Sequence, residues 1–130
     1  MTLPDKITEI LSEDNRVLFA FLYGSVAETG TGNDIDIAVY AANDADHLKL
    51  SADLKISLHK KIGLSPDTFD VRVLNGLAEQ GDIFALLYLK NVLSGNRLLI
   101  DRNRDARSEF LERYGTRFRE CEGLMQEILV

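Results

Sequence analysis

The sequence predicts an α/β fold of the α+β kind, in which a small mixed sheet of about four strands is flanked by helices. Short apolar or alternating runs of strand length recur along the chain, and runs with helical spacing lie between them. A long stretch near the C-terminal end keeps an apolar spacing of three or four residues, which is typical of a long helix. The 130 residues are expected to form a single domain over residues 1–130.

The first helix and the first strand are predicted from two different apolar patterns. Residues 4–13 are expected to form a helix, because Pro4 suits a first helical turn and an apolar stripe at helical spacing follows it. Val17–Tyr23 is apolar throughout, rich in aromatic residues and too short for a free-standing helix. This segment is therefore expected to be a strand buried on both faces.

A tight turn and a second strand come next. Gly24 tolerates unusual backbone angles, and Ser25 offers a hydroxyl and an N–H group at the start of a helical turn, so this pair suits a phosphate. Residues 28–33 contain two glycines and are expected to form a loop. A second strand is expected to open at Asp34, and strand alternation places Asp34 and Asp36 on one face.

The middle of the chain predicts a helix and a third strand. Residues 44–63 alternate as a strand would, yet leucines four residues apart also form a helical stripe. The length of this segment and its content of Leu, Ala and Lys favour the helix. Thr68–Leu74 alternates and is expected to be the third strand, with Asp70 and Arg72 on the same face.

Three further elements complete the predicted fold. The strongly apolar residues 77–93 are expected to form one continuous helix, and residues 97–100 a short last strand. Asp101 is expected to cap a terminal helix that runs to about Met125 and is interrupted at Gly115.

Three carboxylates are the candidates for chemistry. Asp34 and Asp36 are expected side by side on one strand face, where their carboxylates repel each other. Proteins usually accept this cost where a divalent cation lies between the two groups. If the third strand lies beside the second, Asp70 joins them at one rim of the sheet. In the alternative reading, Asp34 belongs to a turn, Asp36 is a solvated strand residue and Asp70 pairs with Arg72. The glycine–serine turn at the end of the preceding strand favours the metal site.

This stretch resembles the nucleotidyltransferase superfamily that includes DNA polymerase beta, and most closely its minimal nucleotidyltransferase branch. The motif of the family is Gly-Ser, a loop, then Asp-x-Asp, with a third acid on a later strand. Here the motif consists of Gly24, Ser25, eight intervening residues, Asp34 and Asp36, with Asp70 as the third acid. The resemblance covers most of the chain and implies a nucleotidyltransferase fold.

The resemblance also implies a reaction. Asp34, Asp36 and Asp70 would hold two Mg²⁺ ions, and Gly24 and Ser25 would grip the phosphates of ATP. Many members of this branch are antitoxins, and those that this chain resembles transfer AMP from ATP to a tyrosine of a HEPN ribonuclease toxin. The implied partners are therefore ATP and a HEPN-type toxin.

Two alternatives remain open. The loop is about two residues shorter than is usual in the family, and Glu28 stands where an arginine is common. Both features favour an antitoxin that masks its toxin by contact and no longer transfers a nucleotide. An enzyme that modifies a small molecule such as an antibiotic is the other alternative, although such enzymes usually carry an extra helical domain.

Charge and hydropathy limit the other function classes. The net charge of −6 argues against direct nucleic-acid binding, which requires a basic surface. No apolar run approaches a membrane span and the first residues lack a signal-peptide pattern, so a cytoplasmic protein is expected. Residues 97–119 hold seven arginines and four acidic residues. This segment faces either a ligand or an acidic partner. In the alternative, it is a solvent-exposed helix with Arg–Glu pairs at helical spacing, such as Arg113 with Glu109. A homodimer or hetero-oligomer is compatible with this pattern.

Overall fold

The computed structural model describes residues 1–29 and 34–129, apart from the side chains of Ser25, Glu28, Thr29 and Leu129. Its elements in chain order are α1 (Leu3–Ser12), β1 (Val17–Tyr23), α2 (Gly24–Thr29), β2 (Ile35–Ala41), α3 (His47–Ile62), a 3₁₀ turn η1 (Pro66–Thr68), β3 (Phe69–Val73), α4 (Leu77–Gln80), α5 (Ile83–Ser94), β4 (Arg97–Asp101) and α6 (Arg104–Leu129).

The four strands form one mixed sheet in the order β3-β2-β1-β4. Strand β1 is antiparallel to both of its neighbours, and β2 runs parallel to β3. The parallel pair needs a crossover connection, which α3 supplies. The mixed α/β fold with a small sheet of four strands and a long C-terminal helix, predicted from the sequence, is confirmed.

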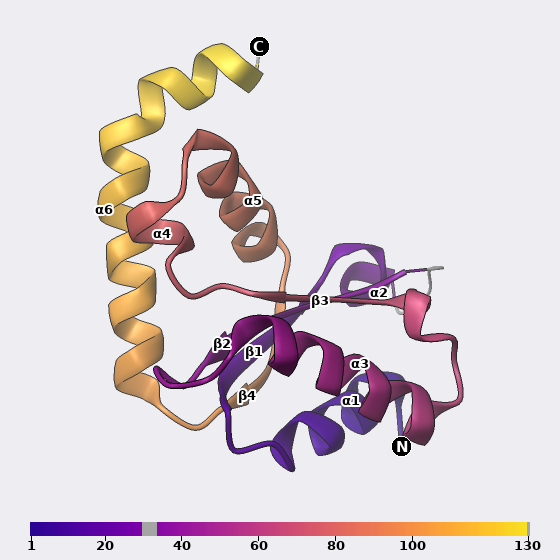
Figure 1. The fold of residues 1–130 in the computed structure, drawn as a ribbon. Helices are drawn as coiled ribbons and strands as arrows, with labels where there is room; N and C mark the ends of the chain where they lie inside the picture. Colours follow the sequence, from indigo (N-terminus) through magenta and orange to yellow (C-terminus); the bar gives the residue numbers. More distant parts are fainter. Residues whose placement is uncertain (30–33, 130) are drawn as a thin grey trace.

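Helices cover both faces of the sheet, as Figure 1 shows, with α1 and α3 on one side and α4, α5 and α6 on the other. Alternating residues of β1 divide between the two cores. Ala20 and Leu22 pack toward α1 and α3, whereas Phe19, Phe21 and Tyr23 pack toward the other three helices. This alternation determines the face on which each polar residue of β2 and β3 lies.

The predicted helix over residues 77–93 is wrong in its continuity, because the structure divides it into α4 and α5. Gly81 adopts an extended backbone at the break, and the Asp82 side chain caps α5 by accepting a hydrogen bond of 3.0 Å from the Ala85 N–H. A side chain on Gly81 would overlap the Leu77 carbonyl and Ala85. Apolar spacing on both sides of the break concealed it from the sequence pattern.

Two predictions about the terminal helix are also wrong. Asn103, not Asp101, caps α6, since its Oδ1 accepts a hydrogen bond of 3.0 Å from the Ala106 N–H. Asp101 ends β4 and instead receives the Arg107 Nε–H at 2.8 Å. The helix passes through Gly115 without a break and reaches Leu129, because packing against α4 and α5 outweighs the roughly 1 kcal/mol that glycine costs in a helix.

The arginine-rich segment has mainly internal contacts among the residues described. Arg102 donates to the carbonyl oxygens of Asp14 and Val17 at 2.7 and 3.3 Å. Arg113 lies 3.0 Å from Glu79 and 3.6 Å from Glu109. The predicted Arg–Glu pairing on α6 is thus present, and it also ties α6 to α4.

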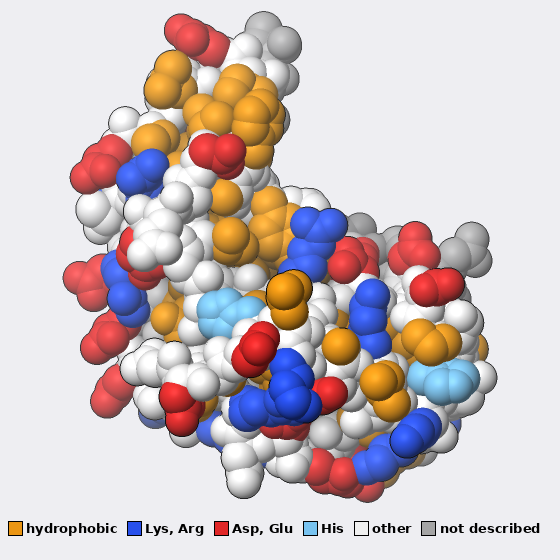
Figure 2. All heavy atoms as spheres, in the orientation of Figure 1, with side chains coloured by type: hydrophobic (Ala, Val, Ile, Leu, Met, Phe, Trp, Pro, Cys, Tyr) orange, Lys and Arg blue, Asp and Glu red, His pale blue; other side chains and the backbone are white. Residues whose placement is uncertain are grey.

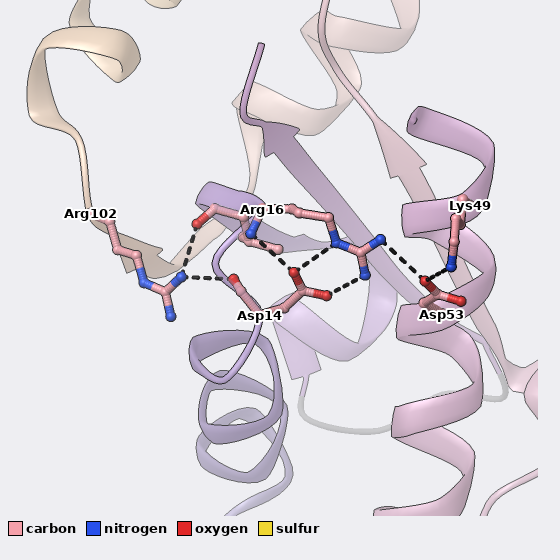
Figure 3. Close-up of polar contacts among 6 residues, drawn as sticks. Asp14, Arg16, Lys49, Asp53 and Arg102 are labelled. Atoms are coloured by element: carbon pink, nitrogen blue, oxygen red, sulfur yellow. Dashed lines mark hydrogen bonds and ion pairs between the residues drawn. The ribbon is translucent and has the colours of Figure 1, made fainter. Parts of the chain in front are cut away.

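A network of charged side chains joins the connection between α1 and β1 to α3 (Figure 3). Arg16 binds Asp14 through two hydrogen bonds of 2.9 and 2.7 Å and reaches Asp53 on α3 at 3.1 Å. Lys49 contacts the same Asp53 oxygen at 3.0 Å. Arg102, which follows β4, donates to the Asp14 carbonyl, so two connections of the fold meet α3 there.

Replacing Arg16 with glutamine is expected to lower the free energy of unfolding by about 1 kcal/mol, because Asp14 and Asp53 lose their common partner. The pairs are partly exposed, so the effect should shrink as salt is raised. Urea denaturation at low and high salt would measure it. Lys49→Gln is the matched control, since it removes only the more exposed ion pair, Lys49–Asp53, and should lower the free energy of unfolding less. Equal losses of stability in the two variants would contradict the role of Arg16 as the common partner of Asp14 and Asp53.

Candidate active site

The site begins where β1 ends and α2 starts. Gly24 has a left-handed backbone with φ of +77°, at the place where the sequence predicted a tight turn and a residue that tolerates unusual backbone angles. A Cβ atom on Gly24 would overlap the Asp36 carboxylate oxygen Oδ2. The chain can therefore turn directly over Asp36 only because this residue has no side chain.

Ser25 lies in the first turn of α2, and the structure places its backbone only. The predicted loop over residues 28–33 is partly wrong, since α2 continues to Thr29, and residues 30–33 lie outside the described residues. Strand β2 starts at Ile35, one residue later than predicted, so Asp34 is an exposed residue just before the strand.

Strand register brings two of the three predicted acids together. Asp36 on β2 is the direct partner of Asp70 on the parallel strand β3, and of Tyr23 on β1. Asp36 alternates with Ile35 and Ile37, which pack toward α1 and α3, so its carboxylate lies on the other face. Both acids are half-buried on the same face of the sheet, and Asp36 lies against Gly24.

The pKa of Asp36 reflects the negative charge that Asp34 and Asp70 bring close to it. Burial raises the pKa of the Asp36 carboxyl above its usual value, and repulsion from Asp70 and then from Asp34 adds to the rise. Arg72 acts in the opposite direction. A divalent cation, whose preferred ligands are carboxylate oxygens, would offset the repulsion that Asp70 and Asp34 exert on the Asp36 carboxylate.

Asp70 is engaged by a basic residue in this structure. Arg72 Nε lies 3.3 Å from Asp70 Oδ2 and 3.5 Å from Oδ1. In the part of the chain that the structure describes, no three acidic, histidine or cysteine side chains stand close enough together to form a ready metal site. The three acids nevertheless fit a divalent cation, because all of their ligand atoms are carboxylate oxygens. The ion pair between Asp70 and Arg72 is half-exposed and therefore weak.

Two tyrosines next to the acids were missed by the sequence reasoning. The hydroxyl groups of Tyr23 and Tyr88 lie 2.9 Å apart, and the Arg72 guanidinium lies over the Tyr88 ring at 5.1 Å from its centre. Strand alternation could have placed Tyr23 on the same face as the acids. No pattern in the sequence could have placed Tyr88, because its position depends on how α5 packs on the sheet.

Several solved structures share the fold. A chain of a mutant MntA–HpeT toxin–antitoxin structure matches with a TM-score of 0.66 and 18% identity, and all of both chains is covered. A chain of a toxin–antitoxin crystal structure with AMP-PNP matches with a TM-score of 0.65 and 18% identity, over 98% of this chain and 99% of that chain. A structure of tri-AMPylated Shewanella oneidensis HEPN toxin in complex with MNT antitoxin matches with a TM-score of 0.60 and 18% identity, over 98% and 96%.

No curated protein sequence matches this chain significantly. A family model does match, however. Residues 5–105 fit the model of the family described as polymerase beta, nucleotidyltransferase. That range includes the turn at Gly24 and the three acids. The chain therefore belongs to the polymerase beta nucleotidyltransferase family.

Proposed function

We propose that this protein is a magnesium-dependent nucleotidyltransferase that moves AMP from ATP to a hydroxyl group of a partner protein. The observation that carries the proposal is the strand register that sets Asp36 beside Asp70, directly under the turn at Gly24. Membership of the nucleotidyltransferase family supports the class of reaction. The similar structure with AMP-PNP supports ATP as the donor.

Each residue would have a distinct task. Asp34, Asp36 and Asp70 would hold two Mg²⁺ ions through their carboxylate oxygens. Bound there, the ions would neutralise charge on the triphosphate and on the leaving pyrophosphate. Gly24 and Ser25 would receive the phosphates through backbone N–H groups and, at Ser25, the hydroxyl.

The transfer itself is an in-line displacement at the α-phosphate. The acceptor oxygen forms a bond to the α-phosphorus while the bond from that phosphorus to the oxygen bridging the α- and β-phosphates breaks, and pyrophosphate leaves. The acceptor hydroxyl loses its proton, and Asp70 would either lower the pKa of that hydroxyl through the metal or accept the proton at a carboxylate oxygen. Positioning and charge neutralisation supply the catalysis, and no covalent enzyme intermediate is needed.

A protein acceptor fits the surface of the molecule. Figure 2 shows hydrophobic side chains gathered over α5 and the C-terminal part of α6. Phe84, Leu124 and Ile128 are 66%, 60% and 46% exposed there. Exposed apolar side chains in such a group are typical of protein–protein contact sites. Because similar structures are toxin–antitoxin complexes, one with an AMPylated HEPN toxin, we propose a HEPN-type toxin as the acceptor.

The second candidate function is an antitoxin that acts by contact alone. The short loop between Ser25 and Asp34, together with Glu28, favours it, since both affect the segment that would grip the triphosphate. None of the helices among the described residues combines the length and the apolar character that a membrane span requires.

Incubation with α-labelled ATP, Mg²⁺ and a candidate HEPN toxin is expected to label the toxin on a tyrosine. The matched control is the double variant Asp34→Asn and Asp36→Asn, which keeps the size of both side chains and should transfer no label. Mass spectrometry of the toxin would identify the modified residue. A toxin that binds both proteins tightly but is labelled by neither would overturn the proposal and support masking by contact.

A further inference from the structure

Arg72 holds a position that the reaction scheme leaves unexplained. Its side chain lies on the same sheet face as Asp70, two residues further along β3, and turns back to bring Nε within 3.3 Å of that carboxylate. Here a positive charge already lies where a metal bound to Asp70 would be attracted.

A second contact keeps Arg72 in place. The guanidinium carbon lies 5.1 Å from the centre of the Tyr88 ring, within the range of a cation–π interaction. Tyr88 is itself held to the sheet, because its hydroxyl lies 2.9 Å from that of Tyr23 and the two rings meet edge to face with centres 6.0 Å apart. Tyr23 is buried at the end of β1, next to Gly24.

The contact with Asp70 is suited to exchange. The side chains of Asp70 and Arg72 are 43% and 57% exposed, so water screens the pair and it is weak. A doubly charged cation shared between Asp36 and Asp70 would relieve the repulsion that the paired strand positions create, which a single guanidinium beside Asp70 does only in part.

We propose that Arg72, held in place by the Tyr88 ring, is the counter-ion of Asp70 in the free protein. Arg72 keeps a divalent cation off Asp70 until the nucleotide triphosphate arrives with its metal. The proposal rests on the function proposed above. Arg72 is then a positioning residue that acts through Asp70. The free protein therefore binds a divalent cation at Asp70 only weakly, and binding of the cation there is coupled to binding of the nucleotide.

Mn²⁺ binding without nucleotide, followed by electron paramagnetic resonance, tests this directly. Arg72→Gln is expected to bind Mn²⁺ on the order of tenfold more tightly than the wild type, because a positive charge next to the ligand is removed. Arg72→Lys keeps the charge and should stay close to the wild type. Arg104→Gln removes an equal charge from α6, at the opposite end of the sheet, and should change nothing.

The nucleotide provides the second arm of the experiment. With a non-hydrolysable ATP analogue present, the wild type and Arg72→Gln are expected to bind Mn²⁺ equally tightly, since the triphosphate brings the cation into the site. Equal Mn²⁺ affinity of these two proteins without nucleotide would overturn the role of Arg72. Unchanged Mn²⁺ binding by Asp36→Asn would instead overturn the metal site, and with it the proposed function.

Discussion

Replacing Asp36 with asparagine is expected to reduce nucleotidyl transfer by about 10³-fold or more while the protein stays folded and at least as stable. Asp36 is the acid that faces both Asp70 and the turn at Gly24, so its loss removes the carboxylate that we propose as a shared metal ligand. Metal stabilisation of transition-state charge is worth several kcal/mol, and each ~1.4 kcal/mol corresponds to a factor of ten in rate. Steady-state transfer of labelled AMP would measure the loss.

The stability of the same variant has a predictable dependence on pH. The pKa of Asp36 is raised in the folded protein, by burial first and then by repulsion from Asp70 and Asp34. A raised pKa means that ionisation disfavours the folded state, so the wild type loses stability as pH rises through the unfolded-state pKa of about 4 toward the folded value. Asp36→Asn has no such loss.

Thermal unfolding of both proteins in chelator, from acid to neutral pH, would test this. The melting temperature of Asp36→Asn is expected to exceed that of the wild type at neutral pH, and the difference should vanish in acid. Asp34→Asn is the comparison variant: it removes only the repulsion that ranks below burial and Asp70 in raising the pKa of Asp36, so its melting temperature should rise less than that of Asp36→Asn. A variant that melts lower than the wild type at neutral pH would show that Asp36 stabilises the fold.

The strands could be predicted because their patterns are local. Val17–Tyr23 is apolar on both faces since both cores use it, and this is visible in seven consecutive residues. The turn at Gly24 could be predicted for the same reason. The proximity of Asp36 and Asp70 was predicted only on the condition that their strands are neighbours, because register depends on pairing that no local pattern determines.

The errors arose where a tertiary contact overrides a continuous apolar pattern. Residues 77–93 keep helical spacing across Gly81, yet the chain breaks there because α4 packs against α6 while α5 contacts both α6 and β1. Gly115 was expected to interrupt α6, and packing against the same helices keeps the helix continuous. Tyr88 escaped notice as a site residue because its place beside Tyr23 depends on this packing.

Gly24→Ala is expected to lower both stability and activity through two separate effects. An alanine at φ of +77° strains the backbone by roughly 1–2 kcal/mol. Its methyl group would also overlap Asp36 Oδ2, so the carboxylate or the turn must move. Misplacing a reacting group by about 1 Å can cost on the order of 10² in rate, and we expect a loss of at least this size in AMP transfer.

Gly63→Ala separates these two effects. Gly63 ends α3 with φ of +89°, and a Cβ atom there has no neighbour within 4 Å. The two substitutions therefore carry a similar backbone cost, and only Gly24→Ala disturbs Asp36. Chemical denaturation should show a loss of stability in both variants and a larger one in Gly24→Ala, whereas AMP transfer and Mn²⁺ binding should fall in Gly24→Ala alone. Equal activity of the two variants would show that the close approach of Gly24 to Asp36 serves the fold and not the reaction.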